Sequence, residues 1–149
     1  MTQEDKELLL KDLCARLPYG VRVFVSGDDF DNYQYPYLLT AISKFGQDSF
    51  CKIYSPIYTP LGCPGIENVK PYLFPLSSMT DKDLIVFLQI RGMNLNSYEL
   101  KTFRRGEMAI VFTLSSYSRH SDWLNAHHFD YRGLIEKGLA IDATGLSIY

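Results

Sequence analysis

Residues 2–25 read TQEDKELLLKDLCARLPYGVRVFV, and this stretch decides the fold. The hydroxyl of Thr2 precedes an acidic residue, Asp5, by three positions, which is the spacing of a capping box at the start of a helix. Leucines then recur at helical spacing, while Asp12 and Arg16 fall on the face predicted to meet water. The pattern predicts a helix over residues 3–16.

A strand follows this helix after a short break. Pro18 and Gly20 disfavour continued helix, and valines at alternate positions from Val21 to Val25 are typical of a strand with one buried face. Aromatic and β-branched residues predict three further short strands, over residues 35–43, 50–54 and 67–73, with another near residue 57.

The second half of the chain is predicted to be more helical. Thr80 and Asp83 repeat the capping-box spacing and predict a helix that ends near residue 92. Residues 94–105 are ambiguous, and the apolar run 108–114 fits a buried strand or a helix equally well. Two short helices are expected over residues 121–129 and 132–137, followed by a terminal strand or tail.

These elements predict an α+β fold with an N-terminal helix, a small antiparallel β-rich lobe and a helical C-terminal lobe. The chain has 149 residues, of which 46% are hydrophobic and 21% charged, enough apolar material for one core. We expect a single domain over residues 1–149, with the lobes meeting near residue 78, because each half is small for an independent core.

Charge and cysteine content limit the classes of function. The formal net charge is −2, whereas nucleic-acid binders usually carry a clear basic excess. Three cysteines without a close pair, and an acidic start unlike a secretory leader, favour a cytoplasmic protein with free thiols. No apolar run is long enough to span a bilayer, so we expect no membrane association.

The strongest candidate site lies in residues 121–137, SDWLNAHHFDYRGLIEK. On a helix, Trp123 and His127 share a face, and Asp130 lies three residues after His127, where a carboxylate can orient an imidazole. The candidate binding residues are Trp123, His127, His128, Asp130, Tyr131 and Arg132.

Three interpretations of this chain remain open. In the first, Trp123 and neighbouring apolar residues belong to the core, and the two histidines lie at the boundary between core and surface. His127, His128 and Asp130 form the centre of a small hydrolase in the second. The third is nucleic-acid binding, in which basic residues meet phosphates and rings stack on bases; its residues are Tyr98, Lys101, Phe103, Arg104 and Arg105, with tyrosines of the β-rich half as a platform.

The search for catalytic and cofactor motifs gives no assignment. The sequence contains no zinc-binding HExxH or paired CxxC, no nucleophile elbow and no phosphate-binding glycine loop. We therefore assign no catalytic residue, no metal ligand and no cofactor, and we expect a protein that is not an enzyme.

Three blocks of sequence carry a resemblance. The opening EDKELLLKDLCARLPYGV, the central VKPYLFPLSSMT and the closing DWLNAHHFDYRGLIEKGLAIDATGL resemble small proteins of gut Bacteroides-type bacteria and their phages or mobile elements. The resemblance implies an intracellular protein and brings no activity or site residue. The many Tyr and Phe residues, the near-neutral charge and the lack of an assembled catalytic motif favour an adaptor or modulator that binds another macromolecule, most simply a protein.

Overall fold

The computed structural model describes residues 1–27, 36–45, 48–54, 62–90 and 118–149. Several predictions fall outside these residues. They are most of the loop 26–32, the strand near residue 57, the ambiguous segments 94–105 and 108–114, and the nucleic-acid candidates Tyr98, Lys101, Phe103, Arg104 and Arg105.

The N-terminal helix forms as its sequence predicts. Helix α1 spans Gln3–Arg16, and the Thr2 hydroxyl accepts a hydrogen bond from the Asp5 amide at 3.1 Å while the Asp5 carboxylate accepts one from the Thr2 amide. The Pro-containing 3-10 turn Leu17–Tyr19 ends the helix and leads into β1. Helix α2, Asp81–Gln89, begins with the same reciprocal cap between Thr80 and Asp83. Both capping-box predictions are confirmed.

The strands form one mixed sheet of six. Their bounds are β1 Arg22–Val25, β2 Tyr37–Phe45, β3 Asp48–Tyr54, β4 Val69–Pro75, β5 Phe129–Asp130 and β6 Ile141–Asp142. The order is β3-β2-β1-β4-β5, and β6 also pairs with β4. The first four strands are antiparallel neighbours, whereas β5 and β6 run parallel to β4. Strand β4 therefore joins the two halves of the chain.

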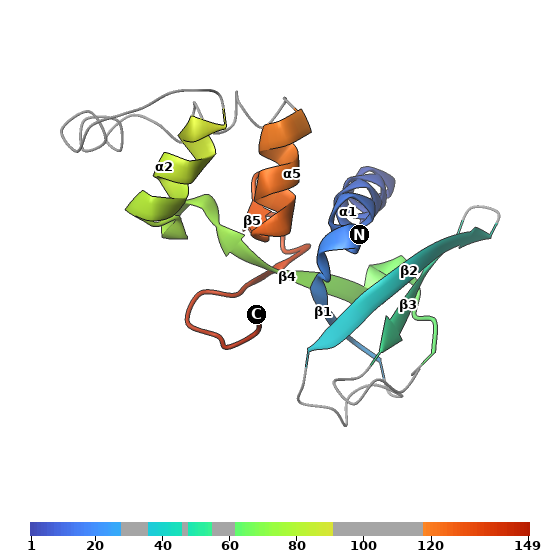
Figure 1. Ribbon diagram of the computed structural model, residues 1–149. Helices are drawn as coiled ribbons and strands as arrows, with labels where there is room; N and C mark the ends of the chain where they lie inside the picture. Colours follow the sequence, from blue (N-terminus) through green and yellow to red (C-terminus); the bar gives the residue numbers. More distant parts are fainter. Residues whose placement is uncertain (28–35, 46–47, 55–61, 91–117) are drawn as a thin grey trace.

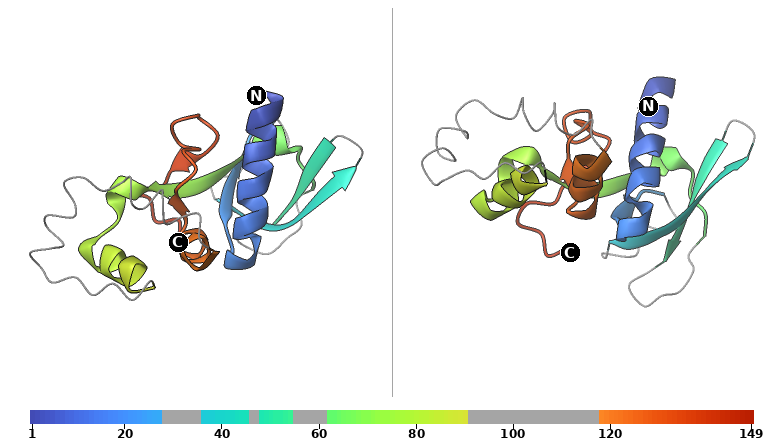
Figure 2. Two further views of the ribbon diagram at one scale, coloured as in Figure 1. Left: turned by 90° about the horizontal axis from the view of Figure 1, so that it is seen from above. Right: turned by 45° about the horizontal axis from the view of Figure 1, so that its top comes forward.

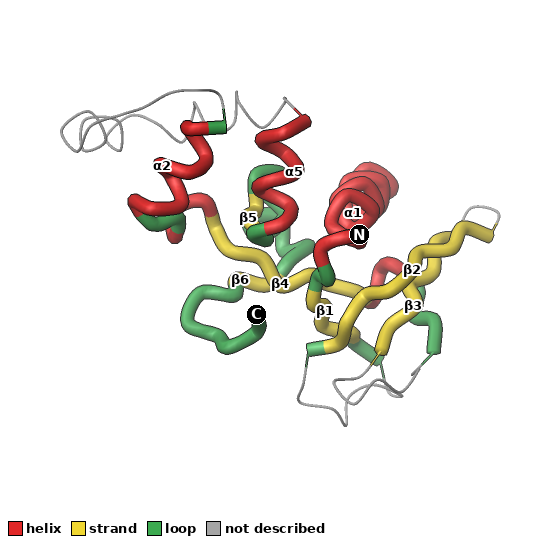
Figure 3. Tube along the Cα trace, viewed as in Figure 1, coloured by secondary structure: helices red, strands yellow, loops and turns green. Residues whose placement is uncertain are grey.

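Helices α1, α2 and α5 (Ser118–Ala126) lie in a row above β4, while the C-terminal tail runs below it (Figures 1 and 3). An N-terminal helix, a mixed sheet and a C-terminal helix confirm the α+β class. No helix among the described residues is both long and apolar enough to cross a membrane.

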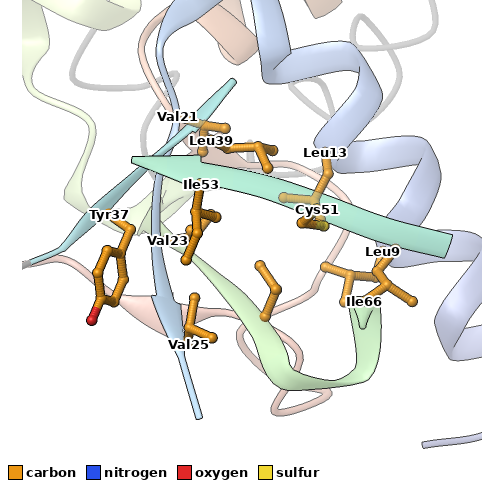
Figure 4. Packing of buried hydrophobic residues seen from close by; sticks show 11 residues of the cluster. Leu9, Leu13, Val21, Val23, Val25, Tyr37, Leu39, Cys51, Ile53 and Ile66 are labelled. Atoms are coloured by element: carbon orange, nitrogen blue, oxygen red, sulfur yellow. The ribbon is translucent and has the colours of Figure 1, made fainter. Parts of the chain in front are cut away.

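The largest core lies between α1 and the antiparallel strands. Leu9 and Leu13 of α1 are fully buried against alternate strand residues such as Val23 and Ile53 (Figure 4). A second cluster joins α2, α5 and β5, and a third surrounds Leu73 on β4. Because Leu73 lies on the strand that both halves share, the third cluster connects the sheet to the C-terminal turns around Leu134.

Two predictions about the C-terminal helices are wrong in detail. Helix α5 begins at Ser118 and ends at Ala126, three residues earlier at each end than expected. Residues 134–138 form hydrogen-bonded turns and not a helix. Gly133 has φ of +70°, a left-handed conformation that a helix interior excludes, so the chain turns there.

The prediction that Asp12 and Arg16 face water is also wrong. Both are fully buried, whereas Cys14, which falls on the leucine side of the predicted helix, is exposed. The reason is tertiary: α1 packs against α5, so the polar side of α1 is covered as well as its leucine side. A helical pattern read from one segment cannot show this second contact.

The α1 core predicts a specific stability loss. Leu13→Ala should lower the free energy of unfolding by about 2–5 kcal/mol, because it removes buried methyl groups and leaves a cavity. Leu146→Ala is the matched control, since Leu146 is 47% exposed and its truncation should cost less than about 0.5 kcal/mol. Urea unfolding followed by circular dichroism measures both. Equal losses for the two variants would contradict this packing.

Candidate functional site

The structure divides the predicted stretch 121–137 into three environments. His127 lines a surface hollow and stacks on Trp123, His128 packs against the C-terminal tyrosine, and Tyr131 and Arg132 join a buried ionic network with α1. Asp130 orders the backbone that follows it. The three environments adjoin one another because a single tight turn at the end of α5 sends consecutive residues in different directions.

The turn at the end of α5 depends on His128. Its φ is 57°, the left-handed conformation that commonly ends a helix and is usually taken by glycine. The His128 amide donates to the Asn125 carbonyl at 3.2 Å, and the His128 carbonyl accepts from the Phe74 amide at 2.9 Å. The chain therefore leaves α5 and enters β5 with Phe129 directly beside Phe74 of β4.

The paired phenylalanines border a hollow of about 260 Å³ between β4, α2 and α5. Phe74, Phe129 and His127 line it together with Ser78 and Asp83. This volume lies below the roughly 300–1,000 Å³ of typical small-molecule pockets. The hollow combines an apolar lining with a few polar groups, the composition typical of a recognition site.

A continuous series of ring contacts supports the hollow. The Trp123 ring stacks on His127 with centroids 4.0 Å apart and on Phe129 with centroids 5.8 Å apart. Phe129 in turn meets Phe74 at 6.3 Å. Since rings are rigid and each is held by the next, the lining is preorganised, and little conformational entropy remains to be lost on binding.

His127 is the exposed member of this series. Its Nδ1 lies 2.9 Å from the Trp123 carbonyl oxygen, and because a carbonyl only accepts, Nδ1 carries the proton. The remaining ring nitrogen, Nε2, is then an acceptor in the neutral imidazole. The predicted helical pairing of Trp123 with His127 is confirmed, and it fixes both the tautomer and the ring plane.

The polar groups of the hollow come from the segment before and within α2. The Ser78 hydroxyl donates to the Pro75 carbonyl at 2.7 Å. One oxygen of Asp83 accepts from the Thr80 amide at 2.9 Å and from the Thr80 hydroxyl at 2.5 Å. Asp83 therefore has two roles, since it caps α2 and adds a negative charge to the edge of the hollow.

Asp130 serves the backbone. Its carboxylate accepts hydrogen bonds from the amides of Arg132, Leu134 and Ile135 at 3.3, 3.0 and 2.8 Å. These bonds hold the turns that replace the predicted helix. The predicted role of Asp130 as the group that orients an imidazole has no support in these contacts, because both of its oxygens accept from main-chain amides.

Tyr131 and Arg132 belong to a buried ionic network on α1. Arg16 donates to both oxygens of Asp12, at 2.7 and 3.0 Å, and Arg132 donates to one of them at 2.6 Å. Arg16 also donates to the carbonyl oxygens of Phe129 at 2.8 Å and Leu124 at 3.5 Å. The fully buried guanidinium of Arg16 thus binds α1 to the C-terminal end of α5.

The Tyr131 ring completes this network. The guanidinium of Arg132 lies 4.3 Å from its centroid and that of Arg16 lies 5.7 Å away, which are cation–π distances. The Tyr131 hydroxyl donates to the buried Asn125 side chain at 3.2 Å, and burial raises the pKa of Tyr131. These contacts are internal, so Tyr131 and Arg132 hold the fold in place beside the hollow.

His128 stacks on Tyr149 with ring centroids 3.8 Å apart, and the Tyr149 ring in turn lies 5.9 Å from that of Phe74. Burial lowers the pKa of His128 to about 4, and the charges of Arg16 and His127 lower it further against the opposing effect of Asp12. Its Nδ1 has no hydrogen-bond partner within the described part of the chain. A neutral, enclosed imidazole of this kind is a packing residue.

The chemistry available at the three cysteines is also limited. Cys51 is buried in the α1 core, and burial raises the pKa of its thiol to about 12, so it is protonated at neutral pH. Burial also raises the pKa of the Cys14 thiol. Among the residues that the structure describes, no three His, Cys, Asp or Glu side chains are grouped to hold a metal ion.

Sequence reasoning missed Phe74, Ser78 and Asp83 as neighbours of His127. Phe74 and Phe129 are brought together by parallel pairing of strands that are far apart in the sequence, and no local pattern encodes that register. Asp83 was recognised only as a helix cap. The predicted strand 67–73 stops one residue before Phe74, so no signal in the sequence indicated this group of neighbours.

Comparison of the chain with protein-family models, with curated proteins and with solved structures finds no match. The resemblance of the three sequence blocks to small proteins of gut bacteria and their mobile elements remains a prediction. The function of this protein must therefore be inferred from the geometry of its own surface.

The buried network makes Arg16 the most sensitive position outside the apolar core. Arg16→Ala should lower the free energy of unfolding by about 3–5 kcal/mol, because it leaves the Asp12 carboxylate buried with reduced compensation. Arg119→Ala, at an exposed position of α5, is the control and should cost less than about 0.5 kcal/mol. Chemical denaturation measures both values. A loss below about 1 kcal/mol for Arg16→Ala would contradict the expected contribution of the network to the free energy of unfolding.

His128 predicts a pH dependence of stability. Between pH 6.5 and about 4 the unfolded chain binds a proton at this residue that the folded chain does not, so stability falls as the pH falls. His128→Asn keeps a residue that tolerates the left-handed conformation but does not titrate. Relative to this variant, the wild type should lose on the order of 2 kcal/mol over that interval. Parallel curves of unfolding free energy against pH would refute this prediction.

Proposed function

We propose that this protein is a non-enzymatic adaptor or modulator that binds a partner protein through the hollow between β4, α2 and α5. The observation that carries the proposal is the hollow itself, with rigid stacked rings on its lining and Ser78, Asp83 and His127 as its polar groups. The partner would insert an apolar or aromatic anchor side chain into the hollow, against Phe74 and Phe129.

The size and composition of the hollow favour this interpretation over a small-molecule enzyme site. Protein interfaces concentrate their binding energy in a few pockets that accept one anchor residue, and aromatic residues are enriched there. A hollow of about 260 Å³ matches one such pocket. The hydrolase alternative is less favoured because the Asp130 carboxylate is taken up by backbone amides and His128 is enclosed.

The charge at the edge of the hollow indicates which chemical groups the partner should carry beside its anchor side chain. Asp83 lies at the edge, and His127 presents an acceptor nitrogen when it is neutral. Both groups complement a hydrogen-bond donor or a cation. An anchor ring flanked by a lysine or arginine is therefore the partner chemistry that this geometry supports best.

The test compares two truncations of exposed rings. The full-length tagged protein is used for affinity capture from native lysate of a cell type that encodes it, at low and high salt, with His127→Ala and Tyr19→Ala beside the wild type. Tyr19, 37% exposed, follows α1 and is not part of the hollow. We expect a partner that Tyr19→Ala retains and His127→Ala loses by about tenfold, since His127 borders the hollow.

A second substitution tests the charge. Asp83→Asn keeps an oxygen that can accept the cap hydrogen bonds but removes the negative charge, so it should weaken capture mainly at low salt. The proposal fails if no partner is recovered at any salt concentration, or if the recovered partner binds His127→Ala as strongly as wild type.

A further inference from the structure

The sheet has a second surface that the hollow does not include. Side chains alternate along its strands, and residues such as Val23, Val25 and Ile53 are buried toward α1. The intervening side chains point to the opposite face. In Figure 2, seen from above, α1 lies along β1 beside the β2–β3 hairpin.

On the opposite side the C-terminal tail reaches the sheet where the Tyr149 hydroxyl accepts from the Arg22 amide and donates to the Tyr72 carbonyl. We call this opposite side the open face, because Phe24 and Lys52 on it are exposed.

The open face carries a regular mixture of cations and rings. On β1 it presents Arg22 and Phe24, on β3 Lys52 and Tyr54, and on β4 Lys70 and Tyr72. Phe24 is 40% exposed, unusual for a large apolar ring in a strand next to the centre of a sheet. A face of this composition is not explained by the folding of the chain.

The register brings cations and rings next to one another. Phe24 on β1 lies directly opposite Lys70 on β4. Beyond this paired segment, the Tyr149 hydroxyl bridges the Arg22 amide and the Tyr72 carbonyl. On β3 the Lys52 ammonium is 5.7 Å from the Tyr54 ring centroid. Phe24 and Tyr54 therefore each have a cation as a neighbour on the sheet.

The face has a local positive charge although the whole chain is acidic. Three cations and no carboxylate are among the six residues, whereas the chain has a formal net charge of −2. Asp48, at the far end of β3, lines a separate crevice with Gln3 of α1. Asp142 of β6 lies opposite Leu73, a residue of the buried side, and accepts a hydrogen bond from the Thr144 amide.

We infer that this open face binds single-stranded nucleic acid. Phosphates would pair with Lys52 and Lys70, and unstacked bases would stack on Phe24 and Tyr54, as on other β-sheet platforms that bind single strands. Arg22 and Tyr72 lie beside the C-terminal Tyr149 and border this site. A duplex keeps its bases stacked and offers no ring faces, so it would gain only the charge contacts. This inference does not rest on the hollow or on its partner.

The experiment uses the full-length chain and fluorescently labelled oligo(dT) and oligo(U), measured by anisotropy at low salt. Lys52→Glu/Lys70→Glu should weaken binding by at least about tenfold, because two phosphate contacts are replaced by repulsion. Lys11→Glu/Lys82→Glu makes the same change in net charge at exposed positions of α1 and α2, and it should stay within about twofold of wild type.

A ring substitution tests base stacking independently of charge. Phe24→Ala should weaken binding by about fivefold or more at unchanged net charge, because one base loses its stacking partner. Circular dichroism confirms that each variant is folded. His127→Ala should bind the oligonucleotides like wild type, so failure of this inference and failure of the proposed protein-binding function are distinguishable.

Three results would overturn the inference. They are the absence of binding by wild type to either oligonucleotide at low salt, equal loss in the two charge-reversal variants, and binding of an oligoglutamate peptide of equal charge as tight as that of the oligonucleotides. The last result would show simple attraction of anions without base stacking. A preference for oligo(U) over oligo(dT), or the reverse, identifies which nucleic acid the face selects.

Discussion

The rest of the structure depends on the buried carboxylate of Asp12, which holds two guanidinium groups at once. Arg16 and Arg132 come from opposite ends of the chain, and charges removed from water this far are stable only when every donor finds an acceptor. The remaining donors of Arg16 meet carbonyls of α5 and β5. Leu124 lies in the last turn of α5, where unpaired carbonyls favour a cation.

This arrangement fixes the geometry of the hollow. Arg16 binds the Phe129 carbonyl, and Phe129 is the residue whose register beside Phe74 sets the lining. The left-handed turn at His128 directly precedes Phe129, the residue that makes both of these contacts. A shift of α1 would therefore move the hollow although no residue of α1 lines it. The network contributes positional specificity, the best supported role of buried ionic groups.

Local rules predicted the local elements well. Capping boxes at Thr2 and Thr80 and the alternation from Val21 to Val25 each depend on neighbours within four residues, and each formed. The α+β class followed from them. The sequence contains no comparable signal for the burial of Asp12 and Arg16, because their partner Arg132 is about 120 positions away and the polar residues of α1 look like any solvated helix face.

The candidate site could be located but not assembled from the sequence. Residues 121–137 do contain His127 and Phe129, which line the hollow, and Trp123, on which both of these rings stack. The stretch does not form one constellation, because after the left-handed residue His128 the two histidines have different partners: His127 bonds the Trp123 carbonyl, whereas His128 stacks on Tyr149. Adjacent histidines suggest shared chemistry only when the backbone between them is regular. Here the backbone reverses, so the exposed imidazole is available for recognition while the buried one packs against Tyr149 and keeps the C-terminal tail on the sheet.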